Sequence, residues 1–557
     1  MNKICRQCQK QFEVTQEDLK FYEQISPVFN GEKALIPSPT FCPNCRMQRR
    51  LSFRNERKLY HRKCDASGKE ILSIYSAGRP FKVYEQKEWW SDKWDAFDYG
   101  RDFDFTRSFF DQFRELQTAV PRMNVVTEHN ENSDYTNYNS HLKNCYLLFS
   151  GDSSQDCYYG HWIIFSKNCV DCLNIENCEL AFQCFYSTNL YNSNYVLFSE
   201  NCHDASFLYD CKGCSNCFMC FGLRNKQYCI DNVQYSPDEY KKKLAGFDLG
   251  SDKQLRVLKE QFFAKIEKFP HLYLYRRGRI QDSTGNLLTD TDNCVECFEV
   301  IRGKDCKHVE GAYDTQNVYD SSWVVGQFGY ENCECVPMPY SSAFNVNSYS
   351  GSNLFYTDTC MNNCQDCFGC IGLKHKQYCI LNKQYSKEEY LSLVPKVIAH
   401  MKKMGEWGEF FPISLSPFAY NESEAAEYFP LTVEEVKNKS LLWKQEDSSN
   451  QYHGPEISLP DSIHDCPEMV DKQILTCESC DRHYRLIPLE IEFYKKQGVP
   501  LPRQCFNCRH HERMQWKNPR KLWDRNCMKC NVAIKTSYSP ERPEIVYCEK
   551  CYLQVVY

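Results

Sequence analysis

The sequence predicts a mainly β protein, in which Cys-rich metal-binding modules lie at both ends of a duplicated parallel β-helix, or solenoid, with capping helices. Three observations lead to this fold class. The two ends of the 557-residue chain are copies of each other, the middle is a second duplication, and strand-like runs recur there at short, fixed intervals. Such intervals are typical of solenoids, whose repeats bury their apolar side chains against their neighbours.

These patterns divide the chain into five segments. The two ends carry the zinc modules, the middle holds two solenoid halves with helices, and a Pro- and Gly-containing stretch with little expected core follows them. The predicted boundaries are 1–100 for the N-terminal zinc module with a degenerate second site, 101–270 and 271–404 for the solenoid halves, 405–470 for a linker, and 471–557 for the C-terminal double zinc module.

The terminal copies align at two constant offsets. From Cys42 to Glu88 the match to the C-terminus has an offset of 463, and from Cys5 to Tyr22 the offset is 472. One insertion of nine residues between Tyr22 and Pro37 accounts for the difference. The two ends are therefore one module used twice.

Each module is built on CxxC pairs. A CxxC turn places two thiolates on one side of a tight loop, and two such turns close a tetrahedral zinc site with no open position for a water. We therefore predict structural Zn²⁺ at three sites, with iron or a redox role as the alternatives. The predicted ligands are Cys5, Cys8, Cys42 and Cys45; Cys477, Cys480, Cys505 and Cys508; and Cys527, Cys530, Cys548 and Cys551.

A fourth site is degenerate. Cys64 is kept, but Ser67, Glu85 and Glu88 stand where the C-terminal copy has Cys530, Cys548 and Cys551. We expect this part of the fold to be held by packing of the aromatic run Trp89, Trp90 and Trp94 rather than by a metal.

The first half of each module resembles a probable zinc-ribbon family of bacterial proteins. The shared pattern is CxxC, an aromatic residue, a Phe-Tyr pair, Pro and CxxCR; in the C-terminal copy it consists of Cys477–Cys480, Tyr484, Phe493-Tyr494, Pro500, Pro502 and Cys505–Cys508-Arg509. The N-terminal copy has Cys5–Cys8, Phe12, Phe21-Tyr22, Pro37, Pro39 and Cys42–Cys45-Arg46. The resemblance covers only this part of each end, and it implies a treble-clef or ribbon-like zinc fold.

Charge is distributed unevenly along the chain. Residues 1–70 have 14 Lys and Arg against 8 Asp and Glu, and residues 472–557 have 16 against 9, whereas the whole chain has a net charge of −6. Two basic ends suit a polyanion, although a small zinc module carries Lys and Arg on its surface in any case. A short helix expected after the second CxxC supplies the candidate nucleic-acid contacts Arg46, Arg49, Arg50, Arg54, Arg57, Arg509, Arg513, Arg520 and Lys521.

The middle of the chain repeats at an offset near 150. Gln227-Tyr228-Cys229-Ile230 recurs as Gln377-Tyr378-Cys379-Ile380. Within the first half, Asn or Asp precedes Cys at 144, 156, 168 and 177, and the register continues through 189, 201 and 213. Because the intervals are 12 residues, with one of 9, we predict a β-helix with small Cys side chains inside and Asn or Asp at the turns.

Helices are expected to cap the coils. Ser236 and Ser386 each precede a Glu by three residues, which is the pattern of a capping box. Leu255, Leu258 and Phe262 begin an apolar stripe at helical spacing, and a further helix is expected over 106–119.

Two runs of Cys in the middle leave alternatives open. Cys211, Cys214, Cys217 and Cys220 form one run, and Cys360, Cys364, Cys367 and Cys370 form the other. Buried thiols, extra zinc sites and an iron–sulfur site are the three interpretations, and neither run has the usual ferredoxin spacing followed by Pro.

The sequence favours a cytoplasmic, non-enzymatic zinc protein. There is no signal-peptide-like start, no apolar run long enough for a membrane span, and no phosphate-binding loop, HExxH or nucleophile elbow. We expect nucleic acid, as RNA or a ribonucleoprotein, to be the partner. The alternatives are a protein-interaction scaffold that uses an exposed Tyr- and Phe-rich solenoid face, and a β-helix enzyme acting on a glycan or another polymer.

Overall fold

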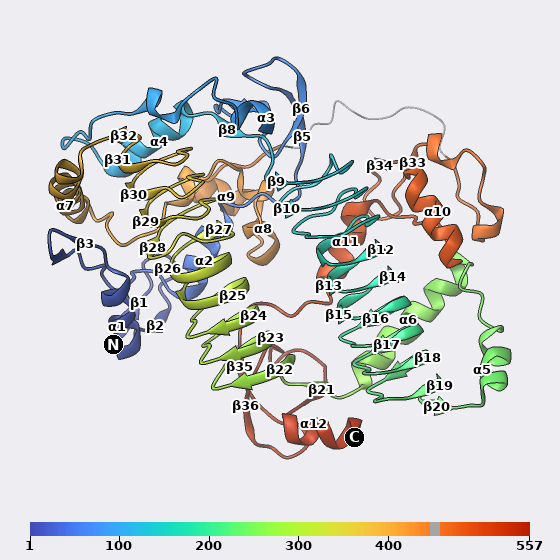
Figure 1. The fold of residues 1–557 in the computed structure, drawn as a ribbon. Coiled ribbons are helices and arrows are strands. Elements are labelled where there is room, and N and C mark those ends of the chain that lie inside the picture. Colours follow the sequence, from blue (N-terminus) through green and yellow to red (C-terminus); the bar gives the residue numbers. More distant parts are fainter. Residues whose placement is uncertain (446–456) are drawn as a thin grey trace. The chain divides into compact units, whose positions relative to one another are not determined.

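The computed structural model describes residues 1–445 and 457–557. The chain forms two compact units, each assembled from segments that are far apart in the sequence (Figure 1). The first unit contains residues 1–125, 274–445 and 520–522, and the second contains 126–273, 457–519 and 523–557. The N-terminal module thus joins the second solenoid half, and the C-terminal module, apart from 520–522, joins the first solenoid half.

A parallel solenoid forms the core of the second unit. His161 pairs with Leu173 and Leu173 pairs with Phe185, so that each coil contains twelve residues. The predicted parallel β-helix is confirmed here. Its strands are β9 (Thr127–Glu128), β10 (Asn139–Ser140), β11 (His161–Ile164), β12 (Lys167–Val170), β13 (Leu173–Glu176), β14 (Glu179–Phe182), β15 (Phe185–Thr188), β16 (Tyr191–Leu197), β17 (His203–Tyr209), β18 (Ser215–Phe221), β19 (Gln227–Ile230) and β20 (Val233–Gln234).

The first unit contains the second solenoid. Its strands also pair in parallel, and each solenoid ends in an antiparallel hairpin, β19–β20 or β31–β32. The strands are β22 (Arg276–Gln281), β23 (Gly285–Asp292), β24 (Cys297–Lys304), β25 (Glu310–Tyr319), β26 (Ser322–Tyr330), β27 (Cys333–Cys335), β28 (Ser342–Ala343), β29 (Ser352–Phe355), β30 (Gln365–Phe368), β31 (Gln377–Ile380) and β32 (Lys383–Gln384).

A left-handed backbone at every third residue turns the coils. Between residues 138 and 231 every third residue has a positive φ, for example Asn144 at 53°, Leu147 at 47° and Ser150 at 51°. A coil of twelve residues therefore has four corners. Asn and Asp tolerate this conformation best after Gly, which is why they mark the corners in the sequence. The intervals of 9 and 12 are both multiples of the three-residue side.

The residues that follow the corners form the interior. The core of the first solenoid half consists of such residues, among them Leu142, Cys145, Leu148, Cys157 and Ile163. The run Cys211, Cys214, Cys217 and Cys220 occupies four successive inward positions, one on each side of a coil. Its regular spacing is therefore the period of the solenoid.

Cys and Ser are interchangeable inside the coils. The Cys145 thiol donates to the carbonyl oxygens of Lys143 at 3.4 Å and Ser154 at 3.5 Å. The Ser154 hydroxyl donates in the same way to the carbonyl oxygens of Asp152 at 3.0 Å and Ile163 at 3.1 Å. A small side chain with one donor thus ties its own turn to the next coil, which accounts for the abundance of Cys.

Capping helices lie where the sequence predicts them. Both capping boxes are confirmed, at Ser236 before α5 (Pro237–Leu244) and at Ser386 before α7 (Lys387–Met404). The helix expected over 106–119 is α4 (Phe109–Ala119), and the stripe that begins at Leu255 belongs to α6 (Asp252–Lys268), which buries Leu255, Leu258 and Phe262.

Several aromatic side chains at the corners are covered by helices, whereas Phe165, also at a corner, is exposed. Phe207 packs on Phe262 of α6 with the ring centroids 5.4 Å apart, and Tyr356 packs on Phe109 of α4 at 5.3 Å. Tyr159 is buried as well. The expectation of an exposed Tyr- and Phe-rich face is therefore wrong for these positions, because the chain's own helices occupy that face.

The terminal modules contain short hairpins and helices. The nine-residue insertion forms the hairpin β3–β4, where Phe29 packs near Tyr390 of α7 with centroids 6.3 Å apart. The N-terminal elements are β1 (Asn2–Ile4), β2 (Gln11–Glu13), α1 (Gln16–Ile25), β3 (Val28–Phe29), β4 (Glu32–Lys33), α2 (Pro43–Leu51), β5 (Tyr60–Lys63), β6 (Glu70–Ser73), β7 (Val83–Tyr84), α3 (Gln86–Trp89), a 3₁₀ turn (Ala96–Tyr99) and β8 (Arg122–Met123).

The C-terminal module repeats this order without the insertion. Its elements, with the short strand before the second solenoid half, are β21 (His271–Leu272), β33 (Leu475–Thr476), β34 (His483–Tyr484), α10 (Pro488–Gln497), α11 (Phe506–Met514), β35 (Trp523–Asn526), β36 (Ala533–Thr536), β37 (Val546–Tyr547) and α12 (Glu549–Val556).

Part of the segment 405–470, which was predicted to be a linker with little core, is packed into the first unit. Residues 446–456 lie outside the described residues, but the preceding part contributes to the core of the first unit through Trp407, Phe410, Phe411 and Leu415. Two short helices follow there, α8 (Ala425–Tyr428) and α9 (Val433–Asn438). The Pro and Gly residues that suggested a linker lie in an irregular but packed chain.

Candidate metal centres and their docking on the solenoids

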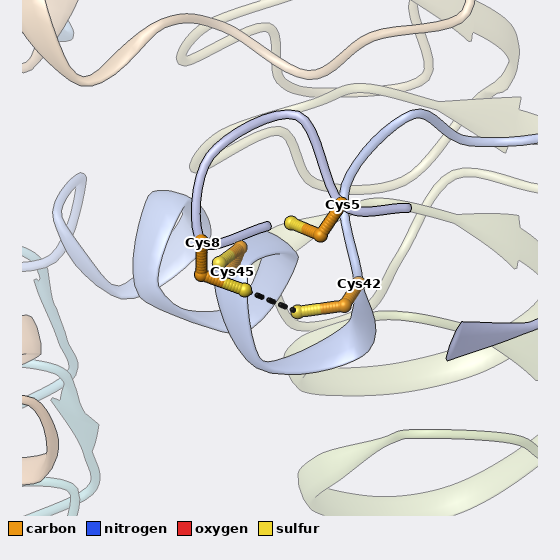
Figure 2. A group of neighbouring side chains, drawn as sticks. All are labelled: Cys5, Cys8, Cys42 and Cys45. Atoms are coloured by element: carbon orange, nitrogen blue, oxygen red, sulfur yellow. Dashed lines mark hydrogen bonds between the residues drawn. The ribbon is translucent and has the colours of Figure 1, made fainter. Parts of the chain in front are cut away.

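Three groups of four Cys come together in the part of the chain that the structure describes. Within each group all four sulfurs lie within 4.8 Å of one another, and the groups match the three predicted sets. Figure 2 shows the first, in which Cys5 and Cys8 face Cys42 and Cys45. After the ion predicted for them, we name the groups the first (Cys5, Cys8, Cys42, Cys45), second (Cys477, Cys480, Cys505, Cys508) and third (Cys527, Cys530, Cys548, Cys551) zinc site.

The sulfur geometry fits zinc. Cys8 and Cys42 have their Sγ atoms 3.7 Å apart, Cys480 and Cys505 are 3.8 Å apart, and the Sγ atoms of Cys530 and Cys548 are 3.7 Å apart. A tetrahedron with zinc–sulfur bonds of about 2.3 Å has edges of about 3.8 Å. Four thiolates around one ion leave no position for substrate, so these sites support structure.

In each site one CxxC lies in a tight turn and the other lies at the start of a helix. The first CxxC lies in a tight knuckle closed by a left-handed residue, for example Gln9, whose N–H donates to the Cys5 carbonyl at 2.9 Å. The second CxxC begins a helix, and Cys42, Cys505 and Cys548 are the N-cap residues of α2, α11 and α12. The positive end of a helix favours a thiolate there.

Backbone N–H groups prepare one thiolate in the third site for a cation. Burial opposes ionisation of Cys527, but the N–H groups of Cys530, Cys548 and Lys529 lower its pKa to about 6. The Cys548 N–H lies 3.2 Å from the Cys527 sulfur. The second site has the same contact between the Cys505 N–H and the Cys477 sulfur at 3.2 Å.

The degenerate site keeps the backbone N–H contacts to a Cys sulfur, although three of the four Cys are missing. The Cys64 sulfur accepts N–H groups from Ser67 at 3.5 Å and Glu85 at 3.2 Å, and although burial opposes ionisation these donors lower the pKa of Cys64. Glu88 is paired with Lys93 at 3.0 Å. Among the described residues these side chains form no metal-binding group.

Aromatic packing supports the degenerate site. Trp89 is buried, and its indole N–H donates to the Pro121 carbonyl at 3.1 Å. Lys374 donates to the Trp89 carbonyl at 2.6 Å and lies 4.5 Å from the centroid of the Trp89 ring and 4.9 Å from that of Trp94. A cation held over indole faces and a buried Trp thus support this segment, whose C-terminal copy has a group of four Cys.

The structure buries four of the five N-terminal candidate nucleic-acid contacts. Arg46 donates from one nitrogen to both oxygens of the Asp320 carboxylate, each at 2.7 Å, and Arg50 pairs with Glu310 and Glu331, each at 3.0 Å. All three carboxylates lie in the second solenoid half. Arg49 pairs with Glu409, and Arg54 pairs with Glu56 and Glu424. These four Arg side chains are buried and matched by carboxylates, which leaves them unable to reach a phosphate.

The predicted C-terminal Arg contacts are also buried and paired with carboxylates. Arg509 and Arg513 share the Asp171 carboxylate of the first solenoid half, at 3.1 and 2.8 Å. Arg520 pairs with Glu299 and lies over the Tyr428 ring at 3.9 Å. Of the predicted contacts only Arg57, which is half-buried, and Lys521, which is exposed, reach the surface. The positive helices of the zinc modules therefore face acidic corners of the solenoids.

The two docking arrangements are copies. Arg46 and Arg509 differ by the module offset of 463, and Asp320 and Asp171 differ by 149, close to the solenoid offset. Asp171 and Asp320 both occupy left-handed corners, with φ of 55° and 46°. The sequence analysis missed these two residues, although acidic residues at equivalent corners of both halves were a signal that could have found them.

The Cys runs of the solenoids show no metal geometry. In the described residues, no group of sulfurs as compact as the zinc sites includes Cys211, Cys214, Cys217 and Cys220 or their second copy. Their thiols donate to backbone carbonyls instead, as Cys211 does to Tyr209 at 3.6 Å and Cys220 to Phe218 at 3.2 Å. Of the three interpretations, buried thiols fit the geometry best.

Comparison with known proteins adds no relative. No protein-family model matches the chain, and no curated protein matches it. Across residues 1–445 and 457–557, none of the helices has the length and the apolar character that crossing a membrane requires.

We expect the purified protein to contain three zinc ions per chain, one for each group of four Cys. Cys42→Ser should lower the content to two because it removes one ligand of a closed site. Cys64→Ser is the matched control and should leave three. Metal analysis of the full-length proteins measures this, and five or more ions per chain would contradict the assignment of the solenoid thiols.

Removing the acidic corner should weaken docking of the zinc helix. Asp171→Asn keeps a residue that tolerates the left-handed backbone but leaves Arg509 and Arg513 buried without their carboxylate, which costs about 3–5 kcal/mol. Hydrogen exchange of α11 should increase. Asp156→Asn, at a corner whose carboxylate accepts from Asn144, is the control; equal exchange in both variants would contradict the docking role.

The pH dependence of the second unit should include Glu490. Burial raises the pKa of Glu490 to about 7, although Arg509 and the Tyr159 hydroxyl favour the carboxylate. An unfolded Glu has a pKa of about 4.3, so the folded state holds the extra proton between about pH 4 and pH 7. Stability that is fully present below pH 4 therefore falls by about 3–4 kcal/mol as the pH rises to 7. Glu490→Gln should remove this loss in thermal unfolding between pH 5 and 8, whereas Glu492→Gln, exposed on the same helix, should not.

Proposed function

We propose that this protein is a non-enzymatic, zinc-stabilised scaffold that binds a protein partner through its third zinc module, residues 523–557. One contrast carries the proposal. The zinc helices α2 and α11 bury their Arg side chains in carboxylate pairs with the solenoids, whereas the module around the third zinc site exposes apolar side chains.

The exposed apolar residues lie on two elements of this module. Met528 and Val532, in and beside the knuckle, are 54% and 51% exposed, and Leu553 and Tyr557, on and after α12, are 43% and 83% exposed. Lys529 donates to Gln554 at 3.0 Å and so ties the knuckle to the helix. In the N-terminal copy of this segment, residues 60–94, Trp90 is the exposed large apolar residue among those described. Apolar side chains concentrated in this way are typical of a protein-binding surface.

A hollow lies beside this surface. It has a volume of about 620 Å³ and is lined by both strands of the hairpin β35–β36 and by Pro540. Ile534 and Ala533 supply its apolar part, and Asp524 and Lys535 supply opposite charges. Each strand of this two-stranded sheet has one edge outside the sheet, and such an edge can accept an extended segment.

The proposal also includes zinc as the bound metal, a zinc-ribbon or treble-clef fold for the modules, and the cytoplasm as the compartment. All-sulfur sites favour zinc, and knuckles followed by helices support the resemblance to zinc-ribbon or treble-clef modules. None of the 36 Cys forms a disulfide. Free thiols in this number suit a reducing compartment such as the cytoplasm.

The other two hypotheses have less support. RNA binding rested mainly on Arg side chains that are now matched by Asp and Glu. An enzyme acting on a polymer needs carboxylates that face a groove, but Asp171, Asp320 and Glu299 accept hydrogen bonds from buried Arg.

Affinity capture with the full-length protein tests the proposal. After nuclease treatment, a partner protein should stay bound to the wild type and be lost from Met528→Glu/Val532→Glu, because the charges disrupt an apolar contact. Ile4→Glu is the matched control, since Ile4 is 68% exposed beside the knuckle of the first site.

The purified partner should then bind the wild type and Ile4→Glu equally well and bind Met528→Glu/Val532→Glu more weakly. Equal binding by all three would rule out the third zinc module as the contact. Capture that disappears with nuclease, and is weakened by salt and by Lys521→Glu, would instead favour nucleic acid.

A further inference from the structure

We propose that a hydroperoxide oxidises the third zinc site before the other two, joining Cys530 to Cys548 and releasing the zinc ion. The inference rests on the zinc assignment of the proposed function and concerns the free protein, in which no partner covers the knuckle of the third site. It rests on a difference in access between three sites that otherwise share one geometry.

Access differs at two ligands. Cys530 is exposed, and Cys548 is half-buried. The corresponding ligands of the first site are Cys8, which is half-buried, and Cys42, which is buried. Those of the second site are Cys480, which is half-buried, and Cys505, which is buried. A peroxide must reach a thiolate directly, so the exposed Cys530 is the ligand that it meets first.

The sulfur separation does not differ. Cys530 and Cys548 have their Sγ atoms 3.7 Å apart, as do Cys8 and Cys42, and those of Cys480 and Cys505 are 3.8 Å apart. Each pair could close a disulfide after a similar small movement. The order of oxidation therefore follows exposure rather than distance.

Docking protects the first and second sites further. Arg46 follows Cys45, and Arg509 follows Cys508, and each guanidinium is fixed by a buried Asp of a solenoid. The residue that follows Cys551 is Tyr552, whose hydroxyl donates to Asp210. The contacts of the third module within its unit include this hydroxyl, the β21–β37 pairing and the bond from the Thr536 hydroxyl to the Tyr273 carbonyl at 2.6 Å, whereas Cys530 in its knuckle is exposed.

The chemistry balances without another reactant. The Cys530 thiolate attacks one peroxide oxygen, the O–O bond breaks, and a sulfenic acid and one hydroxide form. The Cys548 thiolate then attacks the sulfenic sulfur and displaces the second hydroxide. Two thiolates and H₂O₂ thus give one disulfide and two hydroxides, and only Cys527 and Cys551 would be left to hold a zinc ion at this site.

Oxidation has a defined local consequence. Cys548 is the N-cap of α12 and directly follows β37, which pairs with β21 through His271–Val546 and Leu272–Tyr547. Once the disulfide replaces the metal, Cys527 and Cys551 no longer tie the knuckle to the helix. The amides of α12 and of the knuckle at Met528 should exchange faster.

The test is a titration of the zinc-loaded full-length protein with H₂O₂, followed by a chromogenic zinc chelator and by mass spectrometry of alkylated peptides. One zinc of the three should appear in an early phase together with a Cys530–Cys548 disulfide, while Cys42 and Cys505 stay reduced. Reductant and zinc should restore the starting state. Early release from either of the other sites, or loss of all three ions together, would overturn the proposal.

A variant that copies the chain's own degenerate site provides the control. Cys530→Ser/Cys548→Glu/Cys551→Glu reproduces the residues found at Ser67, Glu85 and Glu88 and should hold two zinc ions with no early phase. If this variant fails to fold, the peptide map of the wild-type protein still decides the order. An early phase that persists in the folded variant would contradict the assignment.

Discussion

The left-handed backbone at every third residue governs the first solenoid and, with a few irregular steps, the second. This conformation is unfavourable for every residue with a side chain, and it is least unfavourable for Asn and Asp. With a corner every three residues, one residue in three points inward, and the space enclosed by four short sides accepts mainly small side chains. Cys and Ser satisfy this limit, and each also donates a hydrogen bond to the next coil.

The same geometry creates the docking face for the rest of the chain. Corner residues point outward, so that Phe207 and Tyr356 meet α6 and α4, and Asp171 and Asp320 meet the zinc helices. A buried carboxylate without a partner is costly, as is a buried guanidinium. Each zinc module and its acidic corner therefore depend on each other, and this dependence fixes the module on its coil.

Loss of a metal site can be understood in these terms. The knuckle around Cys64 keeps its N–H contacts to sulfur, and Trp89 with Lys374 supplies packing and charge where three ligands are missing. The third zinc site has retained its metal ligands but has an exposed knuckle. One ancestral half-module thus supports either a packed contact or an accessible metal site, depending on what covers it.

The sequence by itself determined the duplicated modules, the twelve Cys of the three candidate metal groups, the solenoid and its capping helices. These features leave periodic or spaced patterns, because a CxxC turn and a repeating coil are local in the chain. Only the tertiary structure decided where Arg46 and Arg509 point and that residues 407–415 are core. The sequence around an Arg in a basic stretch is the same whether that Arg faces solvent or pairs with Asp320, 274 residues away. Its environment depends on long-range packing, which brings each module to the solenoid half at the other end of the chain.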